Sequence, residues 1–231
     1  MNGLPSRITG IVASPRRAGR FVVEVDGRQR ATLALDAIER LRLAVGQPFD
    51  PVAELVEREA AALATYDRAL NMLAVRARSA RELRRQLVAK GEPADDVDRA
   101  IERLVAAGLL DDAAYARQFS RSKVLGAGLA RRRLQQELFK RGVAREVADE
   151  AIDEVLAEEE VDELAVVVSA ARKKVRSLAR LDAPTRRRRL YGYLARRGYE
   201  PDAIREAMRR VLEGGEGEAA AEAIAEATDE P

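Results

Sequence analysis

Three copies of one sequence pattern constrain the fold of this chain more than any other feature. In the first copy, over residues 79–110, Leu83 and Leu87 are followed by Gly91. The same pattern returns fifty-one residues later and again after a further fifty-six, as Leu134, Leu138 and Gly142, then Leu190, Leu194 and Gly198. Self-similarity at a period of roughly 20–50 residues is typical of stacked units that cannot bury their apolar faces alone. The sequence therefore predicts tandem repeats.

Each copy indicates two short helices joined by a glycine. Ser79 and Glu82 form a capping box at the start of the first helix. Gly91 suits a helix C′ position, where the backbone requires a positive φ. A further periodic segment precedes each pair, over residues 63–77, 112–124 and 161–178. The repeat unit is therefore three helices, and we expect a mainly α fold of tandem three-helix repeats in an elongated, curved array.

The N-terminal residues have a different pattern. Residues 8–13, 20–26 and 29–35 are short β-branched runs, and Asp26-Gly27 favours a hairpin turn. They predict a small antiparallel sheet. Because three strands alone are marginally stable in water, we expect the sheet to pack on the next helix, which has Asp50 as its N-cap and continues into the first repeat.

These patterns predict five segments. We expect a β-rich N-terminal extension over residues 1–48, repeats over 50–110, 111–160 and 161–213, and an acidic tail over 214–231. The tail carries uniform negative charge and one large apolar residue, Ile224, so we expect disorder. Its role is either solubility or competition with partners for a basic face of the chain.

Composition narrows the class of protein. The 231 residues include no cysteine and no histidine, which excludes disulfides and thiolate or imidazole metal sites. The absence of cysteine fits a reducing compartment. No apolar run resembles a signal peptide or approaches the ~18 residues of a membrane span. We therefore expect a soluble, cytoplasmic protein without membrane contact.

Enzyme chemistry finds little support in the sequence. Without histidine and cysteine, the common general bases and thiol nucleophiles are absent. The adjacent carboxylates Asp111 and Asp112 either bind Mg²⁺ or cap a helix start, and we favour capping. No glycine-rich phosphate loop is present. The sequence therefore predicts no catalytic residues, no metal site and no cofactor.

Charge is segregated along the chain. Residues 172–197 carry 11 lysines and arginines against 1 acid, and residues 76–145 carry 17 against 9. Residues 146–163 hold 10 acids and no base. Such blocks are either solvated helix faces or surfaces for a polar partner.

Arginines recur at one register position of the repeat. The two repeated leucines of each copy, such as Leu83 and Leu87, are its stripe leucines. Arg81, Arg132 and Arg188 each stand two residues before the first stripe leucine, about 200° round the helix from it. All three should face solvent. We place them in the first helical turn, where the dipole disfavours cations by roughly 0.3–1 kcal/mol. Their recurrence therefore indicates anion binding on one continuous basic face.

Other candidate binding residues surround this arginine ladder. Tyr191 and Tyr193 either stack on unpaired bases, at about 1–3 kcal/mol each, or pack on the helix over 161–178, which we favour. The remaining candidates are cations: Arg84, Arg85, Arg121, Lys123, Arg131, Arg133, Lys140, Arg186, Arg187 and Arg189.

Three segments together resemble the RecX family of bacterial regulatory proteins. They are residues 66–91 (YDRALNMLAVRARSARELRRQLVAKG), 108–119 (GLLDDAAYARQF) and 134–143 (LQQELFKRGV). The resemblance covers about residues 66–211. It implies a modular chain of three-helix repeats that binds the RecA recombinase filament and restrains its strand-exchange, ATPase and co-protease activities, in DNA recombination, repair and SOS control. The third repeat departs most, with Tyr191-Gly192-Tyr193 in place of Arg84-Arg85-Gln86.

Three functions remain open at this point. The first, favoured by the resemblance, is a monomeric, non-enzymatic modulator that contacts both the RecA filament and DNA. The second is a stand-alone helical nucleic-acid-binding protein that holds phosphate through its arginines. The third is a helical scaffold for acidic peptides.

Overall fold

The computed structural model describes residues 5–213, so the expectation of a disordered tail over 214–231 lies outside the described residues. The fold is mainly α, as predicted, with a three-stranded sheet ahead of tandem three-helix domains. The chain divides after Leu110 into two compact units. The first contains β1 (Ile8–Ala13), β2 (Arg20–Val25), β3 (Arg28–Ala34), α1 (Leu35–Arg40), the 3₁₀ turn η1 (Asp50–Val52), α2 (Ala53–Val75), α3 (Ala80–Ala89) and α4 (Ala94–Ala106).

The predicted antiparallel sheet is confirmed, with strand order β1-β2-β3. Asp26 and Gly27 both have positive φ, 49° and 74°, which matches the twist of a tight hairpin between β2 and β3. The sheet packs on the next helix, as expected. Val23 and Leu33 are fully buried in one cluster with Val56 of α2.

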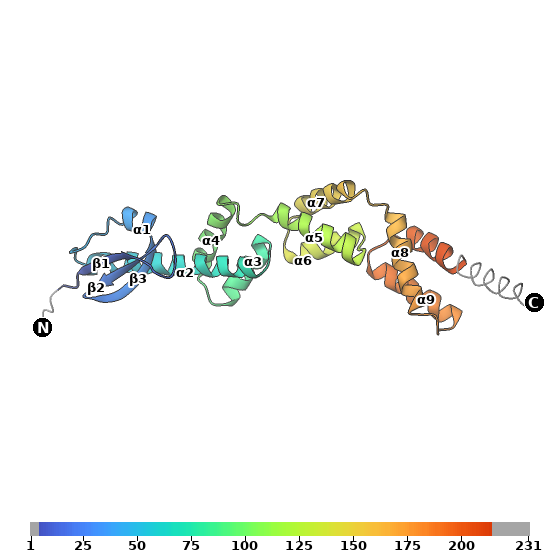
Figure 1. Cartoon of the computed structure of the whole chain (residues 1–231), viewed down its shortest axis with the longest axis horizontal. Helices are drawn as coiled ribbons and strands as arrows, with labels where there is room; N and C mark the ends of the chain where they lie inside the picture. The colour runs from blue at the N-terminus through green and yellow to red at the C-terminus, as the bar shows by residue number, and fades with distance from the viewer. Residues whose placement is uncertain (1–4, 214–231) are drawn as a thin grey trace, which may run out of the picture. The chain divides into compact units, whose positions relative to one another are not determined.

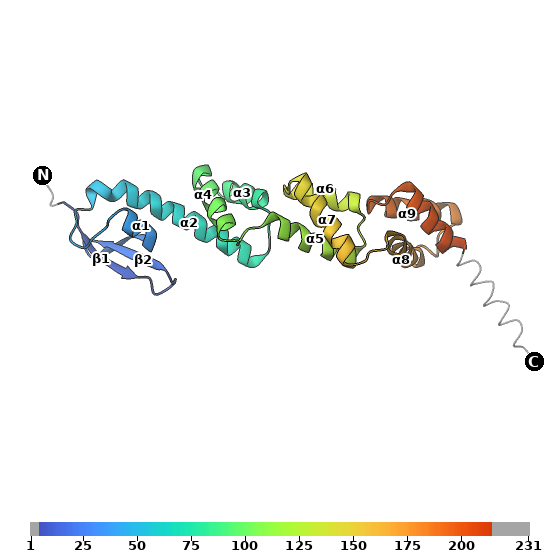
Figure 2. The same cartoon turned by 90° about the horizontal axis from the view of Figure 1, so that it is seen from above.

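Helix α2 packs against the sheet near its start and against α3 and α4 farther along (Figures 1 and 2). Val56, near its start, is buried with the strands, whereas Ala69 is buried with α3 and α4. Asp67 lies between these ends and accepts a 2.8 Å hydrogen bond from Arg20. The expected N-cap at Asp50 is wrong, because Asp50 lies inside η1 and Phe49 occupies the cap position. The unbroken run of the α-helix into the first repeat is confirmed.

In the first repeat, α2, α3 and α4 enclose a leucine-rich core. Leu83, Leu87 and Leu104 are completely buried. The hydroxyl of Ser79 accepts a 3.1 Å hydrogen bond from the Glu82 amide, as the capping box predicts. Gly91 follows α3 with a φ of 88°.

The second unit repeats this arrangement twice. Its elements are α5 (Asp112–Ala127), α6 (Arg131–Arg141), α7 (Arg145–Glu158), α8 (Glu163–Arg176), α9 (Ala183–Arg196) and a helical segment over residues 201–213. The stripe leucines of α6 and α9 are fully buried in separate clusters. Gly142 and Gly198 have φ values of 86° and 89°. Figure 1 shows α5, α6 and α7 together, followed by α8 and α9. Among the described residues, no helix is long and apolar enough to cross a lipid bilayer.

Candidate functional site

The ladder arginines lie on the second helix of each repeat, namely α3, α6 and α9. Arg81, Arg132 and Arg188 are all exposed, which confirms the solvent-facing register. Within residues 5–213 none of the three makes a hydrogen bond or an ion pair. Their guanidinium groups are therefore available to a ligand. Whether all three belong to one continuous face stays a prediction.

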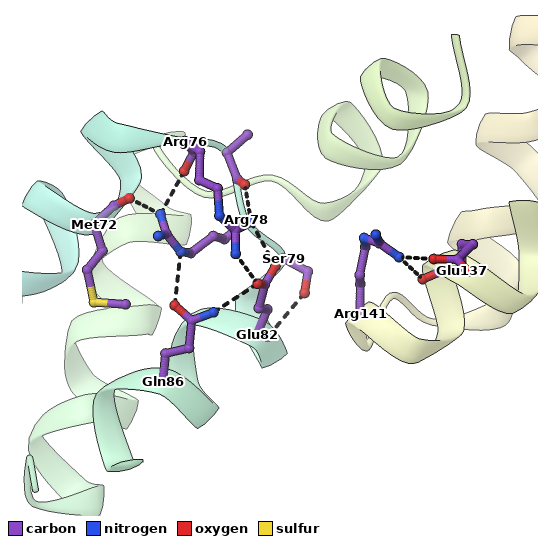
Figure 3. A network of polar contacts seen from close by, with 9 residues as sticks. Met72, Arg76, Arg78, Ser79, Glu82, Gln86, Glu137 and Arg141 are labelled. Carbon is purple, nitrogen blue, oxygen red and sulfur yellow. Dashed lines mark hydrogen bonds and ion pairs between the residues drawn. The ribbon is translucent and has the colours of Figure 1, made fainter. Parts of the chain in front are cut away.

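The start of α3 is fixed by a polar network that includes Arg76, Arg78 and Glu82 (Figure 3). Glu82 is nearly buried and accepts hydrogen bonds from Arg76 and from Gln86, the latter at 2.9 Å. Arg78 donates to Gln86 at 3.1 Å and also reaches the carbonyl oxygen of Met72. The helix start is thus held by its own side chains, whereas Arg81 extends from it without a partner among the described residues.

Three consecutive arginines begin α6, and only the middle one is unpaired. Arg131 forms a bidentate ion pair with Asp153 of α7, in which one N···O distance is 2.9 Å. This hydrogen bonding raises the pKa of Arg131 and lowers the pKa of Asp153. Arg133 pairs with Glu137 at 2.6 Å. Judged by the contacts within residues 5–213, Arg132 is therefore the member of this triplet that is free to bind an external anion. Farther along the helix, Arg141 also donates to Glu137 (Figure 3), which lowers the pKa of that carboxyl group.

The position of Arg188 differs from the sequence prediction. Helix α9 begins at Ala183, with Asp182 as N-cap accepting a 3.0 Å hydrogen bond from the Thr185 amide. This backbone contact lowers the pKa of Asp182. Arg188 therefore lies in the second helical turn, and its placement in the first turn is wrong. Arg81 and Arg132 do lie in the first turn of their helices.

Two of the other predicted cations are held within their own repeats. Arg84 donates to both carboxylate oxygens of Asp98, at 2.6 and 3.0 Å, and the pKa of Asp98 falls as a result. Arg121 pairs with Glu158 and, at 2.6 Å, with Glu159. These contacts make both arginines weaker candidates for external ligands.

The remaining predicted cations have no such carboxylate partner within residues 5–213. Lys123 lies over the ring of Phe119 at 5.7 Å from its centroid. Arg186 is partly buried, and its Nε atom has no hydrogen-bond partner. The others are exposed and without a hydrogen bond or ion pair in the described part of the chain: Arg85, Lys140, Arg187 and Arg189.

The two tyrosines of α9 differ in environment. Tyr191 is 40% exposed. Tyr193 packs against the core of the third repeat, with Arg197 at 4.5 Å and Lys174 of α8 at 5.4 Å from its ring centroid. Tyr193 thus takes the packing role that the sequence analysis favoured. Tyr191 is the accessible ring of the pair.

Further exposed cations lie toward the end of α8 and just after it, and they were not among the predicted site residues. Four of them are exposed and make no hydrogen bond or ion pair among the described residues: Arg172, Lys173, Arg176 and Arg180. They precede Arg186 to Arg189 in the chain, and Asp182 is the single acid between residues 172 and 189. The sequence signal for these four cations was the excess of basic over acidic residues within the segment 172–197. The α8–α9 hairpin is therefore rich in cations that make no hydrogen bond or ion pair with an acid of the described chain.

The adjacent carboxylates Asp111 and Asp112 stand at the start of α5. Asp111 accepts hydrogen bonds of 2.8 and 2.9 Å from the amides of Ala113 and Ala114, so it caps α5 as predicted. Between residues 5 and 213, no cluster of three acids is placed to hold a metal ion.

Family models match the three helical domains in order. Residues 66–104 match the first three-helix domain of RecX, residues 111–152 the second and residues 160–208 the third.

Similar proteins come from several bacteria. A regulatory protein RecX of Pelodictyon phaeoclathratiforme is 34% identical over 144 residues, covering 62% of this chain and 86% of that protein. One from Amycolatopsis mediterranei is 40% identical over 129 residues, covering 56% and 72%. A crystal structure of regulatory protein RecX aligns with a TM-score of 0.71 at 20% identity, over 87% of this chain and 97% of that one. RecX from Lactobacillus salivarius aligns with a TM-score of 0.53 at 19% identity, covering 65% and 96%. The structural likeness supports the fold.

Proposed function

The chain belongs to the RecX family of regulatory proteins, and from this premise we propose that it binds the RecA recombinase filament and restrains strand exchange, ATPase and co-protease activity. The observation that carries the proposal is the ordered match of all three RecX domains over residues 66–208. The chain would act as a monomer in the cytoplasm, in recombination, repair and SOS control.

The unpaired cations support a role at a nucleoprotein surface. A filament of protein on DNA presents carboxylates and phosphates, and guanidinium groups bind both through paired N–H donors. The cations of α8 and α9 that lack internal partners are suited to phosphate, because neutralising phosphates releases counterions and gives affinity without sequence preference. The protein would then act by binding, with no catalytic step of its own.

The test is a titration of the purified chain into RecA assembled on single-stranded DNA. We expect the ATPase rate and the rate of strand exchange to fall as the chain saturates the filament. Co-sedimentation of the chain with RecA should persist at a salt concentration that abolishes binding to DNA alone, because protein contacts add to the phosphate contacts. If the chain neither binds the filament nor changes either rate, the proposal is wrong.

A stand-alone nucleic-acid-binding protein is the second candidate, and the α8–α9 cations favour it specifically. In that case the affinity for DNA would be the same with and without RecA. Binding would also weaken equally with salt in both samples.

A further inference from the structure

An exposed aromatic ring stands out on α6. Phe139 is 69% exposed, although its neighbour Leu138 is completely buried. A single exposed apolar side chain is common on protein surfaces and requires no explanation. Three further features at Phe139 indicate a binding surface.

The first feature is a shallow cavity of about 300 Å³ beside the ring, between α6 and α7. Val143 and Ala148, which are almost fully buried, contribute to its apolar lining. This volume is at the lower end for a ligand pocket, and it suits one or two side chains of a protein partner better than a cofactor.

The second feature is the charge around the cavity. Arg145 lines it with a side chain that is 84% exposed. Lys140, next to Phe139 in the sequence, is exposed and has no hydrogen bond or ion pair among the described residues. Asp149 is the only acid in the lining, and Gln135 and Arg145 both contact it. The surroundings of the ring therefore favour a partner that carries a carboxylate.

The third feature is the repeat register. Arg132 stands seven residues before Phe139, which is about two turns, so the two side chains project from nearly the same side of α6, roughly 10 Å apart along its axis. In the first repeat Arg81 precedes Val88 by the same spacing, and Val88 is 41% exposed. In the third repeat the equivalent of Phe139 is Ala195, which is partly buried. The first two repeats thus share an arginine-plus-apolar face that the third lacks.

We propose that Arg132 with Phe139, and Arg81 with Val88, are two copies of one protein-docking surface. Each copy takes a segment in which a carboxylate, held by the arginine, lies beside an apolar side chain, held by the exposed Val or Phe. Because the surface occurs twice in one chain, it fits a partner that presents the same epitope on successive identical subunits. Two weak contacts of this kind reinforce each other through effective concentration.

This inference rests on the proposed function and assigns its protein contact to α3 and α6, leaving the cations of α8 and α9 for DNA. A nucleic-acid base stacked on Phe139 is the competing occupant. An acidic protein segment is favoured, because the small cavity beside the ring has an apolar lining that suits an aliphatic side chain.

The test replaces Phe139 in the full chain with serine and measures two affinities, one for RecA filaments on single-stranded DNA and one for the same DNA alone. We expect F139S to bind the filament about tenfold more weakly (~1.4 kcal/mol) and the DNA as tightly as the parent chain. The matched control is Leu125→Ser, which removes a 62% exposed apolar side chain from α5 and should change neither affinity. The melting temperature of F139S should stay close to that of the parent chain, because the ring is largely outside the core.

A second variant tests the repetition. V88S should weaken filament binding in the same direction as F139S, and the double variant should bind filaments no more tightly than it binds single RecA subunits. If F139S loses as much affinity for DNA alone as for filaments, the ring stacks on a base and the proposal is wrong. Unchanged filament binding in both single variants would also overturn it. If the parent chain itself fails to bind filaments, the proposed function fails together with this inference. If the parent chain binds filaments and both single variants bind them as tightly, the inference alone fails.

Discussion

The hydroxyl of Tyr199 donates a 2.8 Å hydrogen bond to the carbonyl oxygen of Gly128, and this contact joins the third repeat to the second. A backbone hydrogen bond of 3.0 Å from the amide of Ala130 to the carbonyl of Arg197 lies beside it. Tyr199 is almost fully buried. The α5–α6 connection is thus anchored on the end of α9, within the second unit.

Replacing Tyr199 with phenylalanine should weaken this joint while leaving the ring packed. The change leaves the Gly128 carbonyl without its donor, so we expect a loss of about 0.5–1.5 kcal/mol in the free energy of unfolding. Chemical denaturation followed by circular dichroism measures it. A stability equal to that of the parent chain would mean that water replaces the hydroxyl.

The same tyrosine predicts a pH dependence at alkaline pH. Burial raises the pKa of Tyr199 to about 12, whereas an unfolded tyrosine titrates near pH 10. Above pH ~10 the unfolded state therefore binds fewer protons than the folded state, and stability falls as pH rises to about 12. The Y199F variant lacks this contribution. The difference in unfolding free energy between the two proteins should therefore shrink over that interval, and a constant difference would contradict the assignment.

The close approach of repeats two and three is measurable at Gly198. A Cβ at this position would lie 2.7 Å from the backbone nitrogen of Arg133, and the φ of Gly198 is 89°. Gly91 has the same role in the first repeat and a φ of 88°, but a Cβ there would meet nothing within 4 Å. Gly91→Ala should cost about 1 kcal/mol from backbone conformation alone. Gly198→Ala should cost clearly more, because α6 must also move away. If both variants lose the same unfolding free energy in thermal or chemical unfolding, α6 moves away from residue 198 without strain.

Asp111 offers a test of capping against metal binding. Asp111→Ala should destabilise α5 by about 1 kcal/mol, since the amides of Ala113 and Ala114 lose their acceptor. Asp111→Asn should retain most of the stability, because asparagine caps helices equally well. Addition of Mg²⁺ should change the melting temperature of neither variant. A Mg²⁺-dependent stabilisation that the parent chain has and D111N lacks would restore the metal hypothesis.

The helices and their order followed from local signals in the sequence. Stripe leucines, the Ser79 cap and the positive-φ glycines act over a few residues, so the three-helix repeat was predictable. The start of α9 was misplaced because the Asp182 cap and Pro184 begin this helix earlier than its counterparts α3 and α6, measured from the stripe leucine.

Which arginines pair with acids on a neighbouring helix could not be predicted from such local signals. The Arg84–Asp98 and Arg131–Asp153 contacts join residues that are 14 and 22 positions apart in sequence, and they form only when α3 packs on α4 and α6 on α7. Counting charges in blocks treats paired and unpaired arginines alike. Only the packed structure separates Arg132 from its neighbours Arg131 and Arg133.

The arginine ladder gives the last prediction. Replacing Arg81, Arg132 and Arg188 with glutamine should preserve the fold, because all three side chains are exposed and make no internal ion pair in the described chain. At Arg81 and Arg132 it should slightly stabilise the helices, since cations in a first turn oppose the dipole by roughly 0.3–1 kcal/mol. Arg188, in the second turn, should contribute little to that gain.

Binding by the triple variant should change in strength and in salt dependence. Each lost phosphate contact lowers the slope of log affinity against log salt by about 0.7 on single strands. Arg188 lies on α9, whereas Arg81 and Arg132 are assigned to the protein contact, so the slope for DNA alone should flatten by about 0.7 while filament affinity falls further. The matched control replaces Arg84, Arg121 and Arg131, which removes the same number of positive charges from arginines already paired with acids. Comparable weakening in both variants would mean that net charge alone governs binding. Filament and DNA affinities equal to those of the parent chain would reduce the ladder to a solvated surface, because arginines that bind nothing have no contact to lose.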